Sequence, residues 1–191
     1  MDALSHLRHM IASLDETLVD ALCLRAGFRL NTPLYALPAE AAPVWTDLAA
    51  PFARAPSMAA RIRLLRPAYL RLLLPPLCPP GVEDTPAACL AADAACLEAL
   101  ARRLALSVHV ATRKRESLPD DLQAAIRTGD PVRVEQAITH PAVEEEVLAR
   151  VRARAARFPA PALSASLAVL YRDGLIPLSR RIQVYGLLAG E

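Results

Sequence analysis

Two cationic residues on one helical face are the first candidates for chemistry in this sequence of 191 residues. The chain has 22 Lys and Arg residues, and 21 of them are Arg, so Lys114 is its only lysine. Arg103 precedes Lys114 by eleven residues, which at about 100° per residue leaves them about 20° apart around a helix axis. An ammonium is a compact point charge that a planar guanidinium does not imitate. The spacing indicates an anion-binding face, unless Lys114 is an ordinary surface lysine.

Neutral and acidic side chains recur at helical spacing further along the chain. Ser179 and Gln183 are four residues apart, as are His140 and Glu144, and residues at this spacing share a helix face. Each has a plainer interpretation: Glu144 as part of an acidic first turn that suits the helix dipole, and Arg103 as one of an exposed pair of arginines. Taken singly, none of these residues identifies a site.

Several function classes lack their sequence signatures. The chain has no glycine-rich phosphate loop, no histidine pair at metal-ligand spacing and no G-x-S-x-G, so we expect neither a metal nor a cofactor. The net charge is +2 and the basic residues are scattered, which argues against nucleic acid as a partner. Arginines and prolines interrupt every apolar run, which argues against a membrane span.

The cysteines indicate a reducing compartment. Cys23, Cys78, Cys89 and Cys96 have no C-x-x-C spacing, and the start of the chain has no pattern of a secretory leader. We therefore expect reduced core thiols and a cytoplasmic protein.

The elements that position these residues are predicted to be helices throughout. Ala, Leu, Arg and Glu dominate, only 6 residues are Gly, and prolines separate the segments, so we expect one all-α domain over residues 1–191, a multi-helix bundle. The predicted helices cover residues 3–30, a short stretch within 38–56, and then 57–74, 85–116, 117–129, 130–140, 141–158, 161–172 and 176–188.

A weak internal repeat links two of these helices. Asp15 and Arg25 are ten residues apart, and so are Asp93 and Arg103, with apolar residues at matching positions between them. Chance combined with helical periodicity is one explanation, and duplication of a helical unit is the other.

Several segments together resemble a known family, the all-helical chorismate mutases, in the longer form found in yeast and plants. The first is Leu7-Arg8-x-x-Ile11-x-x-Leu14-Asp15, and the others cover residues 25–35, 96–114, 138–145 and 170–184 in the family's order. The resemblance implies the conversion of chorismate to prephenate in a multi-helix chorismate-mutase-like bundle, without a cofactor and as a homodimer. It implies that Arg8 and Arg103 bind the two carboxylates of chorismate and that Lys114 binds the ether oxygen and a carboxylate.

The same resemblance implies roles for four more residues. Glu144 would bind the ring hydroxyl, Gln183 would lie beside Lys114 at the ether oxygen, and Ser179 and His140 would complete the binding site. Two of these residues depart from the longer enzymes, which usually have Glu in place of Gln183 and Asn or Asp in place of His140.

Effector control is expected to be weak. The longer enzymes bind aromatic amino acids through a pair of arginines and a Gly-Ser-x-x-Thr stretch, whereas this chain has Arg63-Leu64 and alanines at 87, 88 and 91 at the matching places. Two alternatives stay open: an enzyme similar to isochorismate pyruvate lyase, and a catalytically silent binding or regulatory module, favoured if His140 blocks the pocket.

Overall fold

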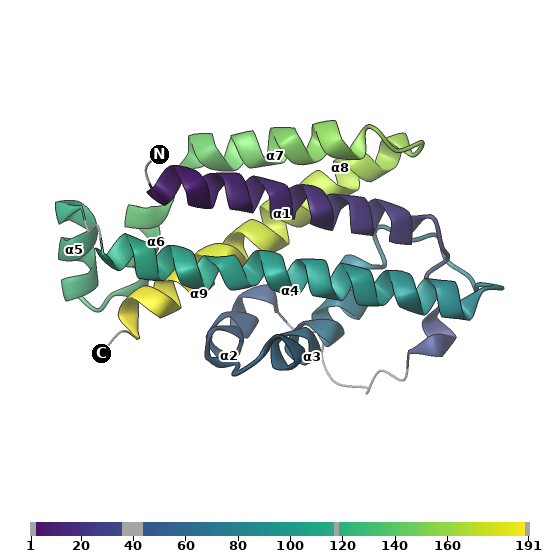
Figure 1. Cartoon of the computed structure of the whole chain (residues 1–191), viewed down its shortest axis with the longest axis horizontal. Helices are drawn as coiled ribbons and strands as arrows, with labels where there is room; N and C mark the ends of the chain where they lie inside the picture. Colours follow the sequence, from purple (N-terminus) through teal and green to yellow (C-terminus); the bar gives the residue numbers. More distant parts are fainter. Residues whose placement is uncertain (1–2, 36–43, 117–118, 190–191) are drawn as a thin grey trace.

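Two long antiparallel helices form the centre of the computed structural model (Figure 1). The structure describes residues 3–35, 44–116 and 119–189. In it, α1 (Ala3–Ala26) and α4 (Pro86–Glu116) lie side by side and run in opposite directions, and α9 (Ile176–Leu188) crosses behind them. The described residues contain helices and no β-strand, so the prediction of an all-α fold is confirmed.

The other helices pack on both sides of this centre. On the far side of α1 lie two helices, and on the far side of α4 lie two shorter ones (Figure 1). These are α7 (Pro141–Ala155) and α8 (Pro161–Leu170) beside α1, and α2 (Ala49–Arg54) and α3 (Met58–Ala68) beside α4. Two short 3-10 turns, η1 (Thr32–Leu34) and η2 (Trp45–Leu48), lie in the connection between α1 and α2. Part of the segment predicted to hold a short helix, residues 38–43, lies outside the described residues.

Helix starts follow the capping and proline signals in the sequence. The Asp130 carboxylate accepts a hydrogen bond from the backbone N–H of Val132 at 2.9 Å, and Ser57 Oγ accepts one from Ala60 at 3.2 Å. Proline occupies the first turn of α6, α7 and α8, where its missing N–H costs nothing. The predicted starts of α6 and α7 therefore match the structure.

The first helix is shorter than predicted, because α1 ends at Ala26 rather than near residue 30. The segment that follows is held by side-chain and long-range contacts: the N–H of Leu30 donates to the carbonyl of Pro79 at 2.7 Å, and the Arg25 side chain donates to the carbonyls of Arg29 and Leu30 at 3.0 and 3.3 Å. Asn31 then adopts a left-handed conformation with φ of 59°, which turns the chain away.

Two π-turns, η3 (Tyr69–Leu73) and η4 (Tyr171–Leu175), widen the helices that hold them. Each ends two residues before a proline, Pro75 or Pro177, whose ring would clash with the carbonyl four residues earlier in a regular α-helix. Residues 161–188 therefore form a continuous helical rod, where two separate helices were predicted.

At one end of the bundle, α5 (Asp120–Arg127) and α6 (Pro131–Ile138) form a small helical hairpin (Figure 1). A separate apolar cluster attaches this hairpin to the ends of α4 and α9. Its buried members are Ala111, Leu122, Val134, Ile138, Val184 and Leu187. The hairpin is thereby held beside the C-terminal half of α4, where Lys114 lies.

At the other end of α1 and α4 lies a buried ion pair between Arg25 and Asp93, called the buried pair below. Arg25 Nε donates to Asp93 at 2.5 Å, and the terminal nitrogens of Arg25 reach backbone carbonyls and Tyr35 Oη, the latter at 3.0 Å. Asp93 also accepts hydrogen bonds from Tyr35 and, at 2.7 Å, from Tyr69. Every charge in this group is satisfied within the protein.

All four cysteines are buried and unpaired, as predicted. Burial raises the pKa of Cys23 and of Cys78 to about 11, and that of Cys96 to about 12. These thiols therefore stay protonated at neutral pH. No helix among the described residues is long and apolar enough to cross a membrane.

Candidate active site

A cavity of about 330 Å³ opens between α1, α4, the α5–α6 hairpin, α7 and α9. Its wall is largely apolar, with contributions from Ile11, Val110, Leu122 and Ile138. Polar side chains converge on it from helices that are distant in sequence. They are Arg103, Lys114, Asp121, His140, Glu144, Ser179, Arg180 and Gln183.

Six of the seven predicted site residues therefore line one cavity: Arg103, Lys114, His140, Glu144, Ser179 and Gln183. The seventh, Arg8, lies on α1, and its side chain is outside the part of the chain that the structure describes. His140 lies in the cavity wall at the start of α7, and a cavity of this size remains beside it.

The α4 wall carries both cations that the sequence placed on one helix face. Arg103 is 8% exposed and Lys114 is partly buried, as expected of side chains that face a cavity rather than solvent. Arg103 Nε donates to Asp15 Oδ1 of α1 at 2.6 Å, and we call these two residues the cavity pair. This is the hydrogen bond that the structure gives Arg103 within the described residues, and it orients the guanidinium of a side chain that lines the cavity.

A buried tyrosine, Tyr171 at the start of η4, lies close to the cavity pair. Burial raises the pKa of Tyr171 well above its usual value, and the negative charge of Asp15 raises it further, although the positive charge of Arg103 opposes this. The phenol is therefore neutral, and Asp15 is the anion that faces Arg103.

The α9 wall supplies neutral hydrogen-bonding groups. Ser179 Oγ lies 2.7 Å from Ser107 Oγ of α4, and both hydroxyls are buried. Gln183 Nε2 contacts the carbonyl of Ser179 at 3.4 Å, one turn earlier on α9. The amide of Gln183 and the hydroxyl of Ser179 thus lie one above the other on the face that lines the cavity.

From the helical spacing, Ser179 and Gln183 share one face of α9, which would leave the flanking Arg180 and Arg181 pointing elsewhere, and Arg180 contradicts this expectation. It lines the cavity, and its NH1 donates to Glu144 at 2.8 Å. The expectation failed because Arg180 meets Glu135 of α6 and Glu144 of α7, so that more than one face of α9 borders the cavity. Arg181, the next residue, does not line it.

Four polar residues in or behind this wall were not predicted as site residues: Asp15, Ser107, Asp121 and Arg180. Ser107 follows Arg103 by four residues on α4, and Asp15 belongs to the internal repeat, so both carried a signal in the sequence. Arg180 carried none, because its two partners lie on other helices. The described residues hold no group of three or more His, Cys, Asp or Glu suited to a metal ion.

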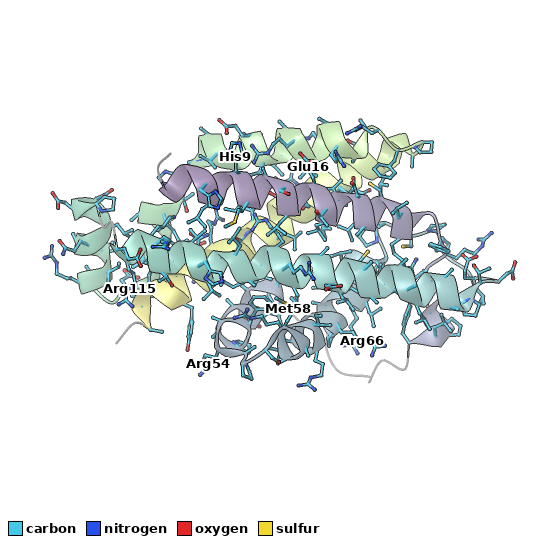
Figure 2. The ribbon with its side chains drawn as sticks, viewed as in Figure 1. His9, Glu16, Arg54, Met58, Arg66 and Arg115 are labelled. Atoms are coloured by element: carbon cyan, nitrogen blue, oxygen red, sulfur yellow. The ribbon has the colours of Figure 1, made fainter. Side chains whose placement is uncertain are left out.

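Side chains outside the cavity connect the helices that form it, and Figure 2 labels two residues near these helices, Glu16 and Arg115. Glu16 lies between α1 and α7, where Arg154 approaches it at 3.3 Å and also binds Asp20 in a bidentate pair at 2.6 and 2.7 Å. Arg115 lies near the end of α4 that leads to α5. These contacts fix α7 and its Glu144 relative to α1.

Comparison with known proteins agrees with this arrangement. The family model for chorismate mutase type II matches residues 89–184. Chorismate mutase 1 of the chloroplast of Petunia hybrida is 30% identical in an alignment of 135 residues, which covers 63% of this chain and 42% of that protein. The chain thus spans less than half the length of this relative.

Solved structures of the same name share the fold. The chloroplast chorismate mutase from Zea mays has a TM-score of 0.77 at 22% identity, covering 97% of this chain and 95% of that one. A chorismate mutase from Candida albicans, solved in complex with L-Trp, has a TM-score of 0.75 at 19% identity, covering 98% of this chain and 94% of that one. The family model matches half of the chain and includes the parts of α4, α7 and α9 that line the cavity, so this chain belongs to the chorismate mutase type II family.

Proposed function

We propose that this chain is a chorismate mutase, which converts chorismate to prephenate by an intramolecular [3,3] rearrangement. The observation that carries the proposal is the position of Lys114: the only lysine of the chain lines the same cavity as Arg103, Glu144, Ser179 and Gln183. Family membership and the fold support the same activity.

The reaction suits a cavity of this composition. One C–O bond of the substrate breaks and one C–C bond forms within the same molecule, with no nucleophile, proton transfer or cofactor. The protein has to hold a dianion in a folded conformation and to stabilise the negative charge that grows on the ether oxygen. Cations and neutral donors are sufficient for both tasks.

Each polar residue of the wall has a role in this scheme. Arg103 binds a carboxylate with its planar fork, with Arg8 proposed for the second carboxylate, and Lys114 places a concentrated charge at the ether oxygen. Gln183 donates to the same oxygen through its amide, which needs no protonation.

The hydroxyl and the rest of the ligand are bound from α7 and α9. Glu144 accepts a hydrogen bond from the ring hydroxyl, and Ser179 and His140 complete the binding site. A relay from Ser107 supports Ser179: if Ser107 donates to Ser179, the hydroxyl of Ser179 is available to donate to a carboxylate.

The test is a turnover assay of the purified chain on chorismate and on isochorismate, with identification of the products. Prephenate from chorismate supports the proposal. Release of pyruvate from isochorismate would instead assign a lyase, and the absence of turnover on both substrates would assign a silent module.

We also propose that aromatic amino acids have little effect on this activity. The Candida albicans neighbour solved with L-Trp argues against this for the fold as a whole. In this chain, however, Leu64 stands beside an exposed Arg63, and the exposed alanines at 87, 88 and 91 have no group that holds a zwitterion. Saturation curves with and without tryptophan and tyrosine should coincide, and a clear shift by either amino acid would refute the proposal.

The assembly is proposed on the resemblance, and the location on the four free, buried cysteines. We propose a homodimer in the cytoplasm, in which residues 1–191 unfold as one domain. A dimeric mass in solution and a single cooperative unfolding transition would support this, and a monomeric mass would contradict the assembly.

A further inference from the structure

We propose that Arg180 is a positioning residue, which holds the Glu144 carboxylate so that one of its oxygens faces the ligand hydroxyl. The effect on turnover rests on the proposed function. The contact between the two side chains does not, and the experiments below test the two separately.

The Arg180 guanidinium lies between two carboxylates from different helices. Its NH1 donates to Glu144 Oε1 of α7 at 2.8 Å, and its Nε lies 3.4 Å from Glu135 Oε1 of α6. That Nε is buried and makes no hydrogen bond, so charge rather than hydrogen-bond geometry holds the Glu135 side of this group. All three side chains are about one quarter exposed, and so only partly screened by solvent.

This arrangement defines where the Glu144 carboxylate points. A glutamate side chain has several rotatable bonds. Glu144 lies in the first turn of α7, and among the described residues Arg180 is the donor to its carboxylate. Arg180 occupies one oxygen, and the second is left for a donor in the cavity. Because a dianionic ligand would repel Glu144, the positive charge of Arg180 also makes an ionised acceptor compatible with that ligand.

Arg181 provides a matched control on the same helix. Like Arg180, it approaches Glu135, with its Nε 3.4 Å from Glu135 Oε2. Unlike Arg180, it neither lines the cavity nor contacts Glu144. Replacing Arg180 or Arg181 by methionine removes one positive charge from one turn of α9 in either case. Only the first removes the contact with Glu144.

The first experiment needs no substrate. In the ¹⁵N-labelled chain, the Nη–H signals of an arginine sharpen when rotation of its guanidinium is slowed, and the Arg180 signals are assigned by their loss in Arg180→Met. We expect these signals in the wild type, their loss in Glu144→Ala and their retention in Arg181→Met. Signals that are absent from the wild type, or that persist in Glu144→Ala, would overturn the proposal.

The second experiment measures kcat and KM for chorismate in a double-mutant cycle. Arg180→Met and Glu144→Ala should each lower kcat/KM about 10- to 100-fold, as expected for loss of a charge-assisted hydrogen bond. The kcat/KM of the double variant should equal that of the less active single variant within about 3-fold. Arg181→Met should stay within about 2-fold of the wild type.

Multiplied losses in the double variant would overturn the proposal, because they would mean that Arg180 acts on the ligand without Glu144. If Arg180→Met does not fold, the cycle is repeated with Arg180→Lys, which keeps the charge but lacks the fork. If the wild type does not convert chorismate, the proposed function fails, and the NMR result alone decides the contact.

Discussion

Two Asp–Arg ion pairs connect α1 and α4 at different places along their length, and the two pairs differ in their surroundings. In the buried pair, all three nitrogens of Arg25 have partners within the protein. In the cavity pair, Arg103 uses its Nε for Asp15, and the residue lines a cavity. We therefore propose that the same pair of residue types serves stability where the guanidinium is satisfied within the protein, and ligand binding where it borders the cavity.

The largest effect on activity is expected from Lys114, which lines the same cavity as Arg103. Lys114→Ala should lower kcat for chorismate about 1000-fold, as for removal of a donor that stabilises developing negative charge. Lys114→Arg should not restore the activity, because a guanidinium is larger and spreads its charge. The measurement is kcat at saturating chorismate, with thermal unfolding as the control for folding. Near-normal activity in either variant would show that charge at this end of α4 is incidental.

Replacing arginine by lysine in both pairs tests the comparison directly. Arg25→Lys should lower the free energy of unfolding by about 3 kcal/mol, a fall in Tm of about 6–12 °C, because one ammonium cannot replace the hydrogen bonds of the buried guanidinium. Its kcat/KM, measured per folded molecule, should change little.

The matched change in the cavity pair should have the opposite pattern. Arg103→Lys keeps a charge beside Asp15 and loses the one hydrogen bond that the guanidinium makes within the described residues, so the free energy of unfolding should fall by only about 1 kcal/mol. The carboxylate fork is lost, and kcat/KM should fall about 100-fold. Similar losses of stability in the two variants would remove the distinction between the pairs.

Gln183 sharpens the account of the cavity end through pH. An amide donates to the ether oxygen at any ordinary pH, so the kcat/KM profile of the wild type should be broad through neutrality. In Gln183→Glu the introduced carboxyl donates only when protonated, so activity should be retained in acid and lost toward neutral and alkaline pH. pH profiles of the same shape in both proteins would show that Gln183 does not contact the ether oxygen. This face of α9 would then not belong to the active site.

The smallest effect is expected from the partly exposed pair between Asp20 of α1 and Arg154 of α7. The hydrogen bond from Arg154 lowers the pKa of Asp20 below its usual 3.8, so the pair stabilises the fold above that pH and the contribution is lost as the pH falls through the lowered pKa. Asp20→Asn should cost less than about 1 kcal/mol at pH 7, and the cost should shrink as the pH falls through the lowered pKa of Asp20, measured by urea unfolding.

Asp173→Asn is the control for this change, because its partner Arg172 is its neighbour in the sequence and both are largely exposed. It should have no measurable effect at pH 7 or in acid. An Asp20→Asn penalty that persists in acid would assign the stabilisation to packing rather than to charge.

Much of the fold was predictable from local signals. Proline and capping residues mark the starts of α6 and α7, and the long helix predicted over residues 85–116 is observed as Pro86–Glu116. The early end of α1 was not predictable, because it depends on the carbonyl of Pro79, about 50 residues away. The continuity from α8 to α9 was missed because a π-turn accommodates Pro177, and periodicity alone does not distinguish this from a break.

The candidate site divides in the same way. Arg103, Lys114, Ser179 and Gln183 were found because each pair shares a face of one helix, which spacing reveals. The Asp-x₉-Arg repeat contained both pairs but paired each Asp with the Arg of its own helix. The structure pairs each Asp with the Arg of the other helix. The role of Arg180 depends on glutamates in α6 and α7, and no spacing within α9 reveals it.

The single lysine also makes the cavity chemically addressable. Reductive methylation with ¹³C-formaldehyde modifies primary amines, and in this chain the only amines are that of Lys114 and that of the amino terminus. One isotopic label is thereby introduced into the cavity wall without changing the sequence or removing the positive charge. The chemical shift of that methyl signal reports directly on what enters the cavity, so the protein already contains the attachment point for a probe of its own ligand.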